Sequence, residues 1–223
     1  MTTKAERSRG MPRRRTIETS APPSRLPLII GGALLVVLLV AAAAAVLMSS
    51  APGTSVAQPA ARVEVSGDAL PVLTDPASDA AIGRAVPELS GTGIDGEPVS
   101  IAPGDGPMAI VVLAHWCSYC QAEVPPLVDY LDAGRLPEGV RVVALTTSID
   151  SARPNYPPSS WLERDAWTVP TLVDDASSSA LEALGLTSFP GFVFVDADGR
   201  VAYRSTGALA ADGFDQIVGQ LAP

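Results

Sequence analysis

Trp116-Cys117-Ser118-Tyr119-Cys120 is the stretch that decides the fold of this chain. Cys117 and Cys120 are the only cysteines among the 223 residues, and two residues separate them. The apolar run 108–114 lies just before them and predicts a strand that is covered on both faces. Residues 121–131 follow and predict a helix. The pattern therefore delivers a Cys-X-X-Cys pair from a buried strand onto the first turn of a helix.

That placement indicates redox chemistry. The first turn of a helix has unpaired backbone N–H groups and a partial positive charge, and both favour a thiolate over a thiol. Cys117 is therefore the predicted nucleophile. Cys120 lies one helical turn further on and is predicted to attack the resulting mixed disulfide.

Charge is distributed unevenly along the chain. The whole chain carries −9, whereas residues 1–25 hold seven basic and two acidic side chains, about +5, so the remainder carries about −14. An acidic body argues against nucleic-acid binding, which needs a basic face. The basic residues of the first segment are Lys4, Arg7, Arg9, Arg13, Arg14, Arg15 and Arg25.

Residues 26–48 contain no charged side chain and predict a transmembrane helix. At about 1.5 Å per residue they can cross a hydrocarbon core of about 30 Å. The basic residues before them predict a cytoplasmic tail at 1–25, with everything after 48 outside the cytoplasm. A cleaved signal peptide ending near Ser55-Val56-Ala57 is the alternative, but this run is longer than the usual apolar core of about 7–15 residues.

The predicted compartment bears on the cysteines. A structural disulfide is an alternative outside the cytoplasm. However, a bridge across two residues closes a very small loop and removes little entropy from the unfolded chain. We therefore favour an exchangeable redox couple at Cys117 and Cys120.

The rest of the chain predicts an α/β domain. Residues 49–81 predict an extracytoplasmic linker in which 63–67 alternates like a short strand, and residues 82–223 predict the folded domain. Asp95-Gly96 indicates a hairpin. Pro125-Pro126 predicts a bend or break in the first helix. The further predicted elements are a strand at 140–146, a serine-capped helix at 159–164, an extended segment at 168–173, a helix at 176–184, a hairpin of 192–195 with 201–204, and a helix at 210–221.

Residues 82–222 resemble the thioredoxin superfamily and, more narrowly, its membrane-anchored TlpA/ResA-type thiol–disulfide oxidoreductases. The resemblance implies a thioredoxin-like fold, a mixed central sheet flanked by helices, with a redox-active Cys117–Cys120 disulfide and no cofactor or metal. The stretches that carry it are Gly83–Pro87, Asp95-Gly96, Ala114–Pro125 and Gly185–Asp196.

The resemblance also implies roles for single residues. It places a cis-proline opposite the cysteines, and we assign this to Pro190, with Pro170 as a superficial match. It gives Glu123 a partly buried carboxylate that exchanges protons with Cys120. The alternative for Glu123 is a solvated helix residue.

Trp116 and His115 are supporting residues in this comparison. A cationic His115 near Cys117 would stabilise the thiolate, and a solvent-facing His115 is equally compatible with the sequence. Residues 147–175 are longer than in a plain thioredoxin. For Trp161 and Trp167 in this insertion, we favour core positions over a partner groove.

The predicted function is thus a tethered reductase of protein disulfides outside the cytoplasm, served by a membrane electron-transfer partner, with cytochrome c maturation as one setting. A DsbA-like oxidase is the main alternative. A copper-binding module fits less well, because such modules use Cys-X-X-X-Cys and a later histidine. A peroxidase is disfavoured, because Ala114 stands where peroxiredoxins place a threonine.

Overall fold

Strand β4 (Met108–Leu113) lies at the centre of a five-stranded sheet, and all six of its residues are buried. The computed structural model describes residues 61–221. The strand order is β6-β5-β4-β7-β8, with β4, β5 and β6 parallel and with β7 and β8 antiparallel to their neighbours. The other four strands are β5 (Arg141–Thr146), β6 (Thr171–Val173), β7 (Gly191–Val195) and β8 (Val201–Thr206). The predicted mixed sheet and its terminal hairpin are confirmed.

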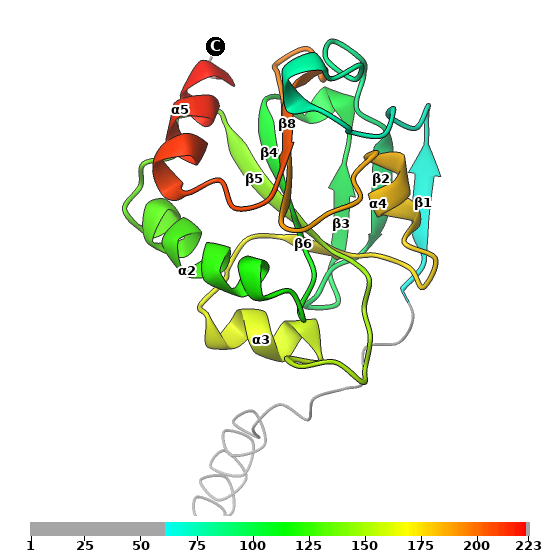
Figure 1. Cartoon of the computed structure of the whole chain (residues 1–223), viewed down its shortest axis with the longest axis vertical. Helices are drawn as coiled ribbons and strands as arrows, with labels where there is room; N and C mark the ends of the chain where they lie inside the picture. The colour runs from blue at the N-terminus through cyan, green and yellow to red at the C-terminus, as the bar shows by residue number, and fades with distance from the viewer. Residues whose placement is uncertain (1–60, 222–223) are drawn as a thin grey trace, which may run out of the picture. The chain divides into compact units, whose positions relative to one another are not determined.

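Two hydrophobic cores lie on opposite faces of this sheet because side chains alternate along β4. Ala109, Val111 and Leu113 pack with α2 (Ser118–Asp132), α3 (Pro158–Arg164) and α5 (Ala211–Leu221). Met108, Ile110 and Val112 pack with α4 (Ser179–Ala183) and a smaller sheet. Figure 1 shows α2, α3 and α5 together on one side of the sheet and α4 with β1–β3 on the other.

The helix that begins at the cysteines is uninterrupted through Pro125 and Pro126, so a break there is wrong and a bend stays a prediction. Each proline lacks an N–H, which leaves the carbonyls of Gln121 and Ala122 without a helical donor. Ala122 and Pro125 are exposed, so water can reach this side of the helix. Its other side, including the buried Val124, is fixed against the sheet.

The smaller sheet is antiparallel, in the order β1-β2-β3. Its strands are β1 (Val63–Ser66), β2 (Glu88–Thr92) and β3 (Pro98–Ile101). The predicted Asp95-Gly96 turn joins β2 to β3, with Gly96 at a φ of 89° and a Gly93 N–H to Glu97 carbonyl bond of 2.7 Å. This hairpin is confirmed.

Residues 61–81 belong to the folded domain, which differs from the predicted linker end at 81. Strand β1 pairs with β2 over its whole length. Leu70 and Leu73 are buried, and their N–H groups donate to the carbonyls of Ala183 (2.9 Å) and Gly185 (2.8 Å). The linker prediction failed because the stretch is rich in small, polar and proline residues, and its few large apolar side chains show no regular spacing beyond the 63–67 strand.

A buried ion pair fastens the same segment. Arg204 in β8 donates from Nε to the Asp79 carboxylate at 2.8 Å, and both side chains are almost fully enclosed. The guanidinium also donates to the carbonyls of Leu184 (2.7 Å) and Pro71 (2.9 Å). One side chain thus joins β8, the end of α4 and the segment before residue 82.

The insertion differs from prediction in detail. Helix α3 begins at Pro158 without a serine cap, since a proline with fixed φ suits the first helical position. Trp161 and Trp167 are buried, as expected for core residues. Helix α4 is shorter than predicted and is followed by Gly185 at a φ of 64°.

The predicted tail at 1–25, the predicted membrane helix at 26–48 and the linker residues 49–60 lie outside the described residues. Within 61–221, the helices are all too short or too polar to traverse a bilayer.

Candidate active site

Cys117 is the N-cap of α2, where the chain turns from β4 into the helix. Its Sγ accepts the backbone N–H of Cys120 at 3.4 Å. One of the N–H groups that a helix start leaves without a backbone partner therefore donates to the sulfur. The residue is 9% exposed. Cys117 is therefore the sulfur of the pair that solvent and a partner can reach.

Cys120 lies one turn further into the helix and is 0% exposed. Its Sγ accepts the backbone N–H of Ala114 at 3.5 Å. Burial raises the pKa of the Cys120 thiol well above its usual value, and the neighbouring Cys117 and Glu123 add to the rise. The pair is thus chemically unequal, with both thiols free in this structure.

Pro190 faces the cysteines. The Phe189–Pro190 peptide bond is cis, whereas the bond before Pro170 is not among the cis bonds of residues 61–221. The Cys117 thiol lies 3.7 Å from the Phe189 carbonyl oxygen, to which it donates. The structure thus has the cis-proline at Pro190 rather than at Pro170. A second cis bond, Tyr156–Pro157, was not anticipated.

Glu123 is buried on the inner side of α2, which rules out the solvated alternative. Its Oε1 accepts the backbone N–H of Leu209 at 3.2 Å. Burial raises the pKa of this carboxyl, although the Leu209 and Ala210 amides partly oppose the rise. Glu123 is thus buried near the cysteine helix start, and its exchange of protons with Cys120 stays a prediction.

His115 takes neither of the two positions considered from the sequence. It is fully buried, and its Nδ1 lies 2.7 Å from the Pro154 carbonyl while its Nε2 accepts the Asp150 N–H at 3.2 Å. A carbonyl can only accept, so Nδ1 carries the hydrogen and the ring is neutral. Burial also lowers the pKa of His115. His115 therefore holds the 148–157 loop and supplies no positive charge to Cys117.

Trp116 joins the same loop to the cysteine pair. Its Nε1–H donates to the Ser148 carbonyl at 2.8 Å, and its ring meets Phe189 edge-on at 5.8 Å. The Arg153 guanidinium lies 4.2 Å from the centre of its ring. Sequence reasoning missed Ser148 and Arg153, because nothing local in the loop shows that it folds back onto Trp116.

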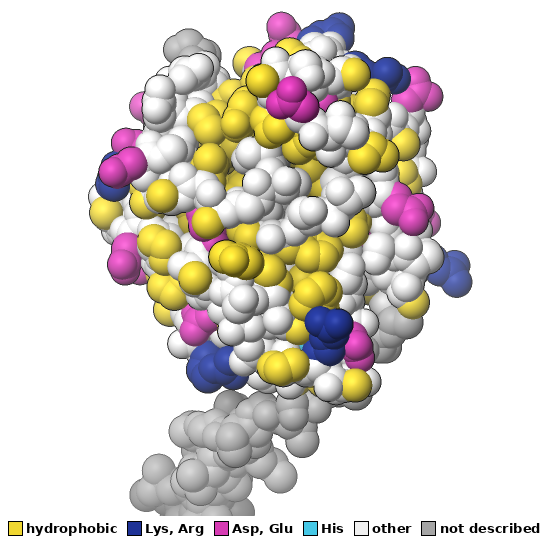
Figure 2. All heavy atoms as spheres, in the orientation of Figure 1, with side chains coloured by type: hydrophobic (Ala, Val, Ile, Leu, Met, Phe, Trp, Pro, Cys, Tyr) yellow, Lys and Arg dark blue, Asp and Glu magenta, His cyan; other side chains and the backbone are white. Residues whose placement is uncertain are grey.

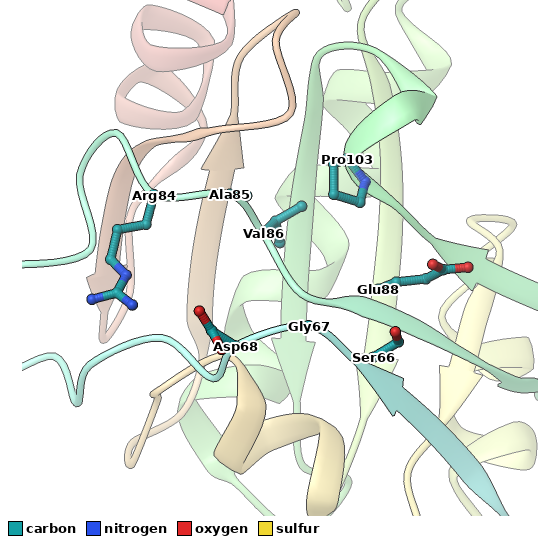
Figure 3. Close-up of a pocket in the computed structure, with 8 residues that line it drawn as sticks. All are labelled: Ser66, Gly67, Asp68, Arg84, Ala85, Val86, Glu88 and Pro103. Atoms are coloured by element: carbon teal, nitrogen blue, oxygen red, sulfur yellow. The ribbon is translucent and has the colours of Figure 1, made fainter.

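A separate shallow pocket lies at the end of β1, as Figure 3 shows. Its lining includes Asp68, Arg84 and Glu88 and contains none of the predicted site residues. Among residues 61–221, no three His, Cys, Asp or Glu side chains gather as metal ligands.

Comparison with known proteins agrees with this geometry. Residues 66–218 match the model of the redoxin family. No curated protein matches the sequence of this chain.

The solved structures show what the fold resembles. A thioredoxin-family thiol:disulfide interchange protein from Chlorobium tepidum TLS has 23% identity and a TM-score of 0.53 over 65% of this chain and 99% of that one. The thioredoxin domain of a thiol-disulfide oxidoreductase from Bacteroides vulgatus has 19% identity and a TM-score of 0.52, over 64% and 99%. A DsbF homologue from Corynebacterium diphtheriae has 19% identity and a TM-score of 0.52, over 67% and 92%. The shared fold is thioredoxin-like.

Proposed function

The chain belongs to the redoxin family and its Cys117–Cys120 pair makes it a thiol–disulfide oxidoreductase; we propose that it is tethered to the membrane and reduces protein disulfides outside the cytoplasm. The unequal burial of the two thiols carries this proposal. Cys117 keeps a small exposed fraction at the start of the helix, whereas Cys120 is fully enclosed. That inequality assigns the order in which the sulfurs react.

The proposed reaction moves two electrons from the dithiol to the partner's disulfide. The Cys117 thiolate attacks one partner sulfur, the partner's S–S bond breaks, and the other partner sulfur leaves and takes up a proton. Cys120 then loses its proton and attacks Cys117 Sγ. The Cys117–Cys120 disulfide forms, and the second partner sulfur departs as a thiol.

Glu123 is suited to the second half of this reaction. Because the Cys120 thiol has a raised pKa, it needs a base before it can attack. A carboxyl whose pKa is also raised is a better base than an ordinary glutamate. We assign Glu123 as the group that receives the Cys120 proton, directly or through water.

The reductive direction is supported by the surroundings of Cys117. Strong oxidants stabilise the reactive thiolate heavily, often with a cation close to the sulfur. Here the hydrogen bond that Cys117 Sγ accepts within residues 61–221 comes from the Cys120 amide, and His115 is neutral. A reduction potential near about −120 mV would refute this direction and favour the DsbA-like alternative.

The tether is the uncharged segment 26–48 behind its basic tail. A reductase on that side of the membrane needs an electron source, and we propose a membrane thiol transporter as its electron-transfer partner. Apocytochrome c maturation and general repair of thiols are the two settings that the family resemblance suggests.

Trapping tests the proposal directly. A Cys120→Ser variant expressed in its native membrane is expected to remain covalently bound to its partners through Cys117, because the second step cannot occur. Cys117→Ser is the matched control and is expected to trap nothing. Trapping by Cys117→Ser but not by Cys120→Ser would overturn the assignment of the nucleophile.

A further inference from the structure

A single arginine lies against the aromatic side chain that precedes the nucleophile. Arg153 stacks on Trp116 with its Cζ 4.2 Å from the ring centre, and its side chain is 50% exposed. Trp116 in turn contacts Phe189, whose carbonyl lies at the Cys117 thiol. The Arg153 guanidinium is thus linked to the nucleophile through Trp116 and Phe189.

Three hydrogen bonds fix the backbone of the loop that carries Arg153. The buried His115 binds the backbone of Asp150 and Pro154, and Trp116 binds the backbone of Ser148. The fixed residues lie on both sides of Arg153 along the chain. Its position beside the active site is thus a product of the fold rather than of a free surface loop.

The guanidinium remains available for another acceptor. Its ion pair in the structure is with Asp150, at 3.5 Å from Nε, and both side chains are half-exposed. Exposed pairs contribute only about 0.2–1 kcal/mol. A carboxylate that approaches in the plane of a stacked guanidinium forms two parallel hydrogen bonds, and such a contact competes well with one long interaction.

The domain that carries Arg153 is strongly acidic. Residues 61–221 hold 22 acidic side chains and eight arginines. Acidic side chains are scattered over the face shown in Figure 2. Three other arginines are paired away from this site, Arg135 with Asp215, Arg141 with Asp105 and Arg204 with Asp79. An acidic partner thus meets a domain of net negative charge, on which Arg153 offers a half-exposed guanidinium stacked on the residue before the nucleophile.

We propose that Arg153 is a specificity-determining residue that binds the carboxylate of an acidic side chain flanking the disulfide-bonded cysteine of the partner protein. This inference rests on the proposed reduction of protein disulfides and adds a partner of stated charge. Asp150 occupies the guanidinium in the free protein and yields it to the partner's carboxylate.

The test compares three disulfide-linked peptides that differ only in having Glu, Gln or Lys beside the cysteine. The measured quantity is the second-order rate constant of the reduced protein with each. Wild-type protein is expected to prefer Glu over Gln by about 1.5-fold to fivefold at low salt, and less in about 0.5 M salt. Arg153→Gln is expected to abolish the preference, and Asp150→Asn to increase it.

An unchanged Glu-to-Gln ratio in Arg153→Gln would overturn the inference. Equal slowing of all three peptides would also overturn it, because that pattern indicates a disturbed loop and not a lost charge contact. Reduction of the Gln peptide by the wild type and by Arg153→Gln reports on the proposed function separately. If the wild type reduced no peptide, both ideas would fall.

Discussion

The buried pair of Arg204 and Asp79 gives the sharpest prediction about stability. Asp79→Asn keeps the size of the side chain, so it leaves no cavity, but it leaves the Arg204 charge buried without its counter-charge. The acceptors left to Arg204 are all neutral: the amide oxygen of the new side chain and the carbonyls of Leu184 and Pro71. Removing one partner of an enclosed pair costs about 3–5 kcal/mol, a large share of the usual 5–15 kcal/mol of a domain.

Urea unfolding at pH 7 measures this cost as a change in midpoint at constant slope. The matched control is Asp215→Asn, which breaks the half-exposed pair with Arg135 and is expected to shift the midpoint little. The hydrogen bonds from Arg204 lower the pKa of Asp79. The wild-type advantage over Asp79→Asn is therefore full above the unfolded pKa near 3.8 and is lost as the pH falls through the folded value.

A loss below about 1 kcal/mol for Asp79→Asn would refute the argument, because that is the size of an ordinary surface substitution. An equal loss in the Asp215 control would refute it too, since burial would then make no difference.

Three further predictions concern single residues. Glu123→Gln is expected to slow release of the mixed disulfide by about 10²-fold or more in quenched-flow experiments, and unchanged release would exclude a role as base. Because the folded pKa of Glu123 is raised, the wild type loses stability as pH rises from about 4.5 through that value, so the variant should unfold at higher urea at pH 7.5. The pKa of His115 is lowered in the folded state, so its contribution to stability is full above about pH 6.5 and is lost as the pH falls through the folded value. In His115→Gln the urea midpoint should lack this dependence on pH. Gly185→Ala is expected to cost more than about 1 kcal/mol, because φ is 64° and a Cβ would lie 2.4 Å from the Pro71 carbonyl, whereas Gly219→Ala, with open space around it, should stabilise α5 slightly in the same assay.

Local patterns predicted the elements that hold the active site. The run 108–114 is apolar at every position, which is typical of a strand covered on both faces, and residues 108–113 form the central strand. The turn at Asp95-Gly96 and the hairpin of 192–195 with 201–204 are short-range signals and were placed correctly. The Cys-X-X-Cys pair depends on the same local sequence, so Cys117 is the cap and Cys120 the enclosed thiol.

The failures all depend on contacts between distant residues. His115 is buried because a loop 35 to 39 residues further on supplies partners for both ring nitrogens. Leu70 and Leu73 join the core through the backbone at Ala183 and Gly185, which no local pattern indicates. The helix continues through Pro125 because its buried face packs against the sheet. Helix propensity is a local property and does not include this packing energy.

The early start of the folded domain sets a geometric limit on the proposed tether. A linker at 49–81 would have reached up to about 110 Å from the bilayer when fully extended, at about 3.3–3.6 Å per residue. With β1 starting at Val63, only residues 49–60 separate the predicted membrane helix from the described domain, and twelve residues span about 40 Å at most. On the proposed tether, partners would be restricted to a layer within about 40 Å of the membrane, where the proposed membrane electron donor and an exported substrate would both be in reach.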